Sequence, residues 1–290
     1  MSHDFEIPAS LPFDWPSLMA FLQLRATPGV EAVRDGVYVR TFGTVAHPGT
    51  LSVSFDPGSS CLRVEHPGSS LNEDDEEIAR RLRQLFRTTI DTTSIERFLG
   101  KDRWLREYVK RHPGLRVPGG WNAFEIAVRA VMGQQVSVAA ATTLMGRLMR
   151  MSATWLSDSA CIFPSPEQIL QADIRDLGMP RKRIETLRGL ARFFVESKSG
   201  SPLTMEGLLA IPGIGRWTAG YILMRAHPEG QNEHDHWPEG DLVLRKALSP
   251  QKELISHVHM AQIFERWKPW RSYATLHIWK GYDGTNSRPE

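Results

Sequence analysis

The sequence has little cysteine. Only Cys61 and Cys161 occur among its 290 residues, and they belong to no Cys-x-x-Cys pair. This absence excludes the common cysteine-rich zinc sites and iron–sulfur clusters. Two distant cysteines also favour a reducing compartment over an oxidising one.

Long apolar runs and a strong net charge are absent too. No apolar stretch approaches the length of a membrane-spanning helix, and the first ten residues, MSHDFEIPAS, have acids but no apolar core, unlike a signal or transit peptide. The formal net charge is +2, which is too small to indicate a nucleic-acid partner. Such a partner must be inferred from clusters of charged residues. With 41% hydrophobic and 23% charged residues, the chain reads as a soluble globular protein of one large or two ordinary domains.

The first 88 residues predict a small α+β unit. Two amphipathic helical segments flank three β-rich runs that are separated by Asp-Gly and Pro-Gly turns. We therefore expect an antiparallel sheet with two helices on one face. The helical segments are Trp15–Arg25 and Asp74–Phe86, and the β-rich runs are Val37–Phe42, Leu51–Phe55 and Cys61–Glu65.

After Thr88 strand signals disappear, and the rest of the chain predicts helices. A strongly apolar helix over Ala123–Met132 is followed by a Gly-Gln-Gln turn and by Ser137, a suitable N-cap for the next helix. Further helical segments are Ser94–Leu99, Arg103–Tyr108, Val138–Met149, Pro166–Ala172, Ile174–Leu177 and the stretch after Arg181, and Ala261–Lys280 closes the chain.

The stretch Met205–Leu248 has the most informative pattern. Ile211–Gly215 reads IPGIG, a break between two helical segments in which proline ends one helix and glycines allow a tight, exposed turn. The free N–H groups at the start of the second helix can hold a phosphate. The alternative is a glycine-rich turn that binds nothing. Asp241 follows a second break between helical segments, and its position suits a helix cap.

Several motifs together resemble a known family. The chain resembles the 3-methyladenine DNA glycosylase II family of the helix-hairpin-helix DNA glycosylase superfamily, and the resemblance covers nearly the whole chain. It rests on Gly213–Ala219 followed by Gly240-Asp241, and on Gly133–Ala139, Leu177–Pro180, His112–Arg116, Phe13–Trp15, Phe21-Leu22 and Trp267–Ala274 (WKPWRSYA).

The resemblance implies both a fold and an activity. It implies a TATA-binding-protein-like domain over residues 1–88 and an all-α helix-hairpin-helix region over residues 89–290, with an active-site cleft between two helical subdomains. It implies a monofunctional enzyme that hydrolyses the N-glycosidic bond of flipped-out alkylated purines, such as 3-methyladenine and 7-methylguanine, in double-stranded DNA. We expect a monomer, cytoplasmic and nucleoid-associated or nuclear, that is not secreted and needs no cofactor or metal. The family leaves room for a monovalent cation at the hairpin carbonyls.

Asp241 is the expected catalytic residue. A carboxylate beside the sugar can stabilise an oxocarbenium-like transition state and orient or deprotonate water. Asp235 is the nearby alternative, although it belongs to a polar His-Asp-His run. That run, together with His227, has mixed spacing that matches no common metal site, so a solvated loop is the better reading.

Four aromatic residues are expected to form the base pocket: Trp279, Tyr221, Trp217 and Phe21. Their ring faces suit a cationic purine through stacking and cation–π attraction. The alternative for each ring is ordinary packing in a hydrophobic core.

The remaining candidates would hold the DNA. Gly213, Gly215 and Thr218 are expected at the phosphate backbone, and the Arg181–Arg183 run could add phosphate contacts or form a solvated face. Gln135 is the expected wedge that fills the space left by the flipped nucleotide, although the family member compared carries an apolar residue there.

Trp217 also stands near the position where bifunctional superfamily members carry a lysine. Its indole cannot form a Schiff base with the sugar, so we expect base release without strand cleavage. Two alternatives remain: a helix-hairpin-helix DNA-binding protein without catalysis, and a bifunctional glycosylase/lyase for oxidised purines.

Overall fold

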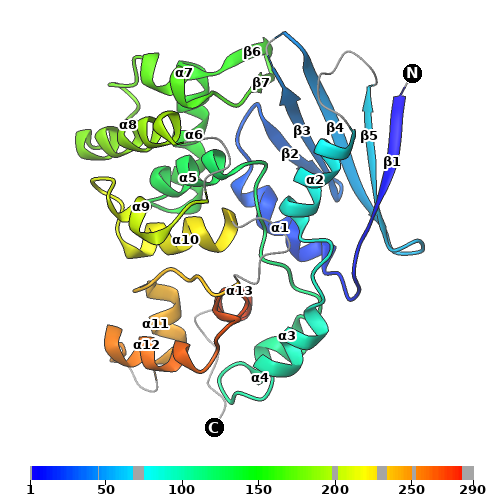
Figure 1. Ribbon diagram of the computed structural model, residues 1–290, viewed down its shortest axis with the longest axis vertical. Coiled ribbons are helices and arrows are strands. Elements are labelled where there is room, and N and C mark those ends of the chain that lie inside the picture. The colour runs from blue at the N-terminus through cyan, green and yellow to red at the C-terminus, as the bar shows by residue number, and fades with distance from the viewer. Residues whose placement is uncertain are drawn as a thin grey trace.

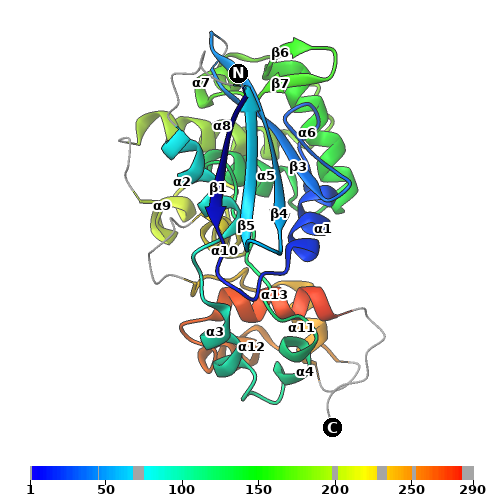
Figure 2. The same ribbon diagram turned by 90° about the vertical axis from the view of Figure 1, so that its right-hand side faces the viewer.

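An antiparallel sheet of five strands forms the N-terminal part of the molecule. The computed structural model describes residues 2–44, 46–67, 75–197, 202–226, 234–249 and 253–282. The strand order is β1-β5-β4-β3-β2, and two helices cover one face of the sheet, as Figures 1 and 2 show from two sides. These elements are β1 (Ser2–Pro8), α1 (Trp15–Arg25), β2 (Glu31–Arg34), β3 (Val37–Gly43), β4 (Pro48–Asp56), β5 (Cys61–Pro67) and α2 (Asp75–Phe86).

The predicted sheet with two helices is confirmed, and its register follows from alternation along the strands. Tyr38 lies opposite Val53, and Val53 lies opposite Val64. All three side chains are buried, because residues paired across neighbouring strands point to the same face of the sheet. The edge strands β1 and β2 were not predicted, since β1 is rich in polar residues and β2 has only four residues.

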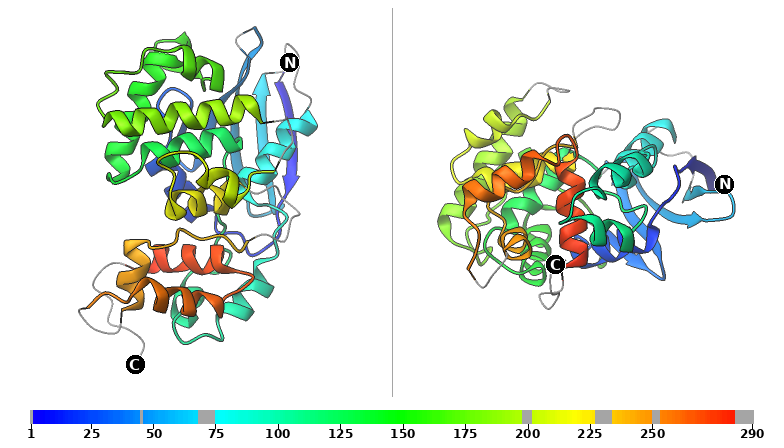
Figure 3. Two further views of the ribbon diagram at one scale, coloured as in Figure 1. Left: turned by 60° about the vertical axis from the view of Figure 1, so that its left-hand side comes forward. Right: turned by 90° about the horizontal axis from the view of Figure 1, so that it is seen from below.

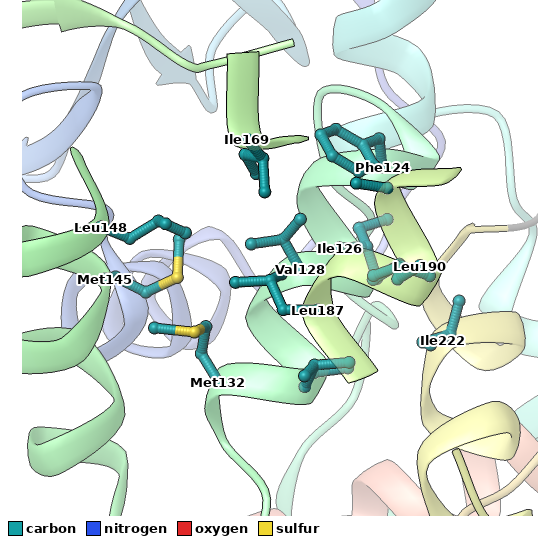
Figure 4. Close-up of a cluster of buried hydrophobic side chains, with 14 of the residues drawn as sticks. Phe124, Ile126, Val128, Met132, Met145, Leu148, Ile169, Leu187, Leu190 and Ile222 are labelled. Atoms are coloured by element: carbon teal, nitrogen blue, oxygen red, sulfur yellow. The ribbon is translucent and has the colours of Figure 1, made fainter. Parts of the chain in front are cut away.

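The rest of the chain is mainly helical and packs around two separate cores. The first core contains side chains from α5 to α10, part of which Figure 4 shows. The second combines α3 and α4 with α11, α12 and α13 from the C-terminal end, and Figure 3 shows these helices as a lower group. The bounds are α3 (Thr92–Leu99), α4 (Arg106–Arg111), α5 (Ala123–Met132), α6 (Val138–Ser152), α7 (Pro166–Gln171), α8 (Arg181–Glu196), α9 (Met205–Leu209), α10 (Arg216–Ala226), α11 (Leu242–Leu248), α12 (His257–Glu265) and α13 (Arg271–Gly281).

Two local predictions in this region were wrong. A short hairpin formed by β6 (Thr154–Ser157) and β7 (Ala160–Ile162) lies where no strand was expected. The hairpin is held by tertiary contacts: the amide of Cys161 donates to Gly29 O at 2.8 Å, and Thr41 Oγ1 donates to the carbonyl of Cys161 at 2.6 Å. Ile174–Leu177, expected to be helical, forms a turn. Among the described residues no helix is long and apolar enough to cross a membrane.

A buried ion pair joins the N-terminal sheet to the first helical core. Arg40 on β3 reaches Glu125 in the first turn of α5 at 3.1 Å, and the Arg40 side chain is only 2% exposed. Arg40 also lies over the ring of Trp121, 4.2 Å from its centroid. Burial raises the pKa of Glu125, although Arg40 opposes this. Because this pair joins β3 to α5 in the protein interior, it fixes the sheet against α5.

Removing one member of this pair should destabilise the fold. In Glu125→Leu the Arg40 guanidinium stays buried without its carboxylate, which typically costs about 3–5 kcal/mol. Replacing both residues, as Arg40→Met with Glu125→Leu, should recover most of the loss, because no unpaired charge remains. Urea denaturation measures both effects. Arg80→Ala, which removes the exposed pair with Glu77, is the control and should cost less than about 1 kcal/mol. Equal losses in Glu125→Leu and Arg80→Ala would contradict this account.

Candidate active site

The hairpin between α9 and α10 presents an exposed glycine turn. Gly213 and Gly215 are both exposed, and Gly213 has φ +90, a conformation that favours glycine. The turn is supported from two sides. Thr186 Oγ1 donates to Pro212 O at 2.9 Å, and the Gln134 side-chain amide donates to Gly213 O at 3.0 Å. The shape of the turn is therefore set by its neighbours.

Thr218 lies inside the hairpin. Its side chain is buried, and its hydroxyl accepts a hydrogen bond from the Gln134 side-chain amide at 3.0 Å. The side chain thus braces the start of α10 rather than facing outward. The backbone N–H of Thr218 lies in the first turn of α10, where the helix itself offers it no acceptor.

Asp241 caps α11 and lies on the wall of a cavity. Its Oδ1 accepts a hydrogen bond from Leu244 N at 3.0 Å, so the predicted helix cap is confirmed. Two indole N–H groups also donate to the carboxylate: Trp217 to Oδ2 at 2.9 Å and Trp279 to Oδ1 at 3.1 Å. The side chain is thereby held in one orientation, and Asp241 lines the cavity.

The alternative acid, Asp235, is already engaged. Arg271 donates to both of its carboxylate oxygens at 2.7 Å. His234 is buried and stacks on Trp270, and His227 lies outside the described residues. No group of His, Cys, Asp or Glu that could hold a metal occurs in the described part of the chain.

The four predicted pocket residues come together around one cavity of about 800 Å³. Tyr221 stacks on Trp217 with ring centroids 5.5 Å apart and planes at 4°. The ring of Trp279 lies 6.2 Å from that of Tyr221. Phe21 reaches the same cavity from α1 in the N-terminal part of the chain. The structure therefore brings these rings and Asp241 to one place.

Gln135 lies in the turn after α5, beside this cavity. Its neighbours Gly133 and Val136 line the cavity, and Gln135 itself is exposed. Its φ of +55 is uncommon for a residue with a Cβ and costs free energy that the surrounding structure must offset. Arg181 and Lys182, at the start of α8, are exposed as well.

Three arginines near the aromatic rings were not predicted. Arg225 is buried on α10 and donates to the Tyr221 hydroxyl at 2.9 Å. Arg25, on α1, and Arg129, on α5, line the cavity. Burial lowers the pKa of Arg129 to about 10, and burial also lowers the pKa of Arg25. Positive charge therefore surrounds the end of the cavity next to Tyr221.

The chain is similar to known proteins over nearly its whole length. Residues 4–122 match the family model described as AlkA N-terminal domain, and residues 128–276 match the model described as HhH-GPD superfamily base excision DNA repair protein. The Escherichia coli (strain K12) protein named DNA-3-methyladenine glycosylase 2 is 33% identical over 92% of this chain and 94% of its own length.

Two further relatives extend the comparison. A Mycobacterium tuberculosis protein described as a probable bifunctional transcriptional activator/DNA repair enzyme AlkA is 35% identical over 94% of this chain, which spans 56% of that relative's length. The solved structure of a 3-methyladenine DNA-glycosylase from Archaeoglobus fulgidus has a TM-score of 0.75 and 22% identity, covering 94% of this chain and 96% of that one. This structural likeness shows a shared fold.

The two hairpin glycines should respond differently to an added methyl group. In Gly213→Ala the new Cβ would lie 2.0 Å from Thr186 Oγ1 at a positive φ, so we expect a loss of stability above about 1 kcal/mol. In Gly215→Ala the Cβ meets nothing within 4 Å, and thermal unfolding should change little. Equal melting temperatures for the two variants would show that Thr186 does not constrain the turn.

Proposed function

The chain belongs to the HhH-GPD superfamily of base excision DNA repair proteins, and on this premise we propose that its cavity receives a flipped-out alkylated purine with the sugar facing Asp241. The protein is a DNA glycosylase of the 3-methyladenine type, a hydrolase of the N-glycosyl bond. Its substrates are alkylated purines in double-stranded DNA, such as 3-methyladenine and 7-methylguanine, and its DNA product is an abasic site.

The observation that carries this proposal is the carboxylate of Asp241, held by two indoles at the cavity wall. When the glycosidic bond stretches, positive charge develops on the sugar. A fixed carboxylate stabilises that charge without reorganising, and it can orient or deprotonate the attacking water. The N-cap bond from Leu244 N holds the carboxylate during these steps, so the cap and the catalytic role support each other.

The aromatic rings suit the base itself. An N-alkylated purine carries positive charge, and the ring faces of Trp217, Tyr221, Trp279 and Phe21 offer stacking and cation–π attraction. Such a base is already a good leaving group. The pocket can therefore select damaged bases with few direct hydrogen bonds.

The hairpin and the turn after α5 suit the DNA backbone and the gap in the duplex. The exposed Gly213 and Gly215 let a phosphate approach the free N–H groups at the start of α10. Helix α8 contacts the hairpin through Thr186, and the exposed Lys182 at its start is proposed to add a phosphate contact, as is Arg181, which pairs with Glu185. Gln135, exposed in a strained turn at the cavity edge, is the proposed wedge. Strain of this kind is typical of functional sites.

Each hairpin carbonyl accepts one hydrogen bond and keeps a second lone pair, which leaves room for a monovalent cation. Ile211 O accepts from Ile214 N, Pro212 O from Thr186, and Gly213 O from Gln134. We propose that the chemistry itself uses no cofactor. We further propose that the protein acts as a monomer, in the cytoplasm at the nucleoid or in a nucleus, and is not secreted.

Base release from alkylated duplexes tests the proposed function directly. Asp241→Asn keeps an oxygen that can cap α11, so the fold should persist, while the loss of the negative charge should lower release of 7-methylguanine by about 10²-fold or more. DNA binding should remain. Glu239→Gln, which changes a half-buried acid two residues away, is the matched control, and its rate of base release should be nearly normal. Near-normal turnover in Asp241→Asn would refute its role. If the unaltered chain released no base from any alkylated duplex, the non-catalytic alternative would be favoured.

Borohydride trapping distinguishes a monofunctional enzyme from a glycosylase/lyase. The side chain at position 217 reaches the catalytic carboxylate, and an indole there cannot form a Schiff base. We expect no covalent adduct with duplex DNA under borohydride. Among the described cavity residues Lys280 is the one lysine. An adduct that disappears in Lys280→Arg would overturn the monofunctional assignment and identify the amine.

A further inference from the structure

The hydroxyl of Tyr221 is surrounded by positive charge. Arg225 Nη1 donates a hydrogen bond to Tyr221 Oη at 2.9 Å, and Arg25 and Arg129 also act on this hydroxyl through their charges. These arginines come from α10, α1 and α5 respectively. Arg225 is fixed in place because it also donates to Pro118 O at 2.8 Å and to Gly119 O at 2.7 Å.

This arrangement leaves the Tyr221 O–H free to act as a donor. A phenolic oxygen can accept from Arg225 and still donate its own proton. Tyr221 accepts hydrogen bonds from Arg225 and from the Arg25 side chain, and it donates none among the hydrogen bonds given for the described residues. The tyrosine lines the cavity, and its ring is held against Trp217. The hydroxyl is therefore a positioned donor on a residue that lines the cavity.

The surrounding charges also make this hydroxyl more acidic than an isolated buried phenol. Burial alone would raise the pKa of Tyr221, but Arg225, Arg25 and Arg129 together hold the pKa below its ordinary value. A phenolate formed here would face three guanidinium groups, which stabilise it. The direction of the shift thus agrees with the hydrogen-bond geometry.

Two kinds of leaving base make different demands on such a group. A cationic N-alkylpurine takes up the glycosidic electron pair and leaves as a neutral molecule, so it needs no proton. A neutral purine takes up the same pair and develops negative charge, which a proton donor must neutralise. Among the described residues that line the cavity, Asp241 is the only carboxylate, and it is assigned to the sugar.

We propose that Tyr221 is the proton donor to neutral leaving bases, with Arg225 as the residue that positions its hydroxyl. This inference rests on the proposed function and extends it to neutral purines that carry an acceptor nitrogen or carbonyl oxygen. The C1′–N9 bond breaks, its electron pair goes to the base, and the Tyr221 proton goes to an acceptor atom of the base. Water adds its oxygen to C1′ and loses a proton to Asp241. Proton exchange with solvent restores the phenol and the carboxylate.

Tyr221→Phe tests this proposal because it keeps the stacked ring and removes only the hydroxyl. The probes are two duplexes, one containing hypoxanthine as the neutral base and one containing 7-methylguanine as the cationic base. We expect release of hypoxanthine to fall by about 10²-fold or more, while release of 7-methylguanine changes little. Tyr108→Phe removes a hydroxyl on α4, at a residue outside the cavity lining, and should leave both rates unchanged.

The pH profile gives a second readout. Tyr221 must be protonated to donate, so hypoxanthine release by the unaltered chain should decline on the alkaline side, beginning below the ordinary tyrosine pKa of about 10. This decline should be absent for 7-methylguanine and absent from the residual activity of Tyr221→Phe.

Several outcomes would overturn the inference. Equal losses on both duplexes in Tyr221→Phe would indicate a structural role for the hydroxyl, and unchanged hypoxanthine release would remove the donor. Release of 7-methylguanine without any release of hypoxanthine by the unaltered chain would refute this inference but leave the proposed function standing. Release of neither base would refute the proposed function itself.

Discussion

Three N–H groups from three helices converge on one carboxylate, and the site depends on this convergence. Trp217 belongs to α10, Leu244 to α11 and Trp279 to α13. Helix α10 packs mainly in the first helical core, whereas α11 and α13 pack in the second. Asp241 therefore links two groups of helices across the cavity. The same bonds that fix its orientation also hold the two walls in their relative positions.

The electrostatics of the cavity contain two opposing tendencies. Aromatic faces attract a cationic base, whereas the guanidinium groups near Tyr221 repel it. The proposed reaction resolves the opposition, because a cationic base would lose its positive charge as the glycosidic bond breaks. Repulsion that is present with the bound substrate and absent with the departing neutral base lowers the barrier between them. With a neutral base, the same charges favour the negative charge that develops on it.

Local patterns made part of this site predictable. The glycine turn at Gly213 and the cap at Asp241 depend on neighbouring residues, and the sequence placed both correctly. The arginine cluster depends on tertiary packing, because α1, α5 and α10 are distant in sequence. One signal was available: Arg225 lies four residues after Tyr221, on the same face of a helix. The β6–β7 hairpin was missed because its strands are too short to show a period and because tertiary hydrogen bonds to Gly29 and Thr41 hold it in place.

The N-terminal part of the chain contributes to the cavity, because α1 supplies an aromatic ring and a positive charge to its lining. Phe21 and Arg25 lie four residues apart on α1, and the Arg25 guanidinium carbon is 3.9 Å from the centroid of the Phe21 ring. Their distance from Tyr221 depends on how the sheet docks against α5, which the buried pair between Arg40 and Glu125 fixes. A loss of that pair would therefore change the base pocket as well as the stability of the fold. Docking between the two parts of the chain is thus a condition for the chemistry proposed at Tyr221.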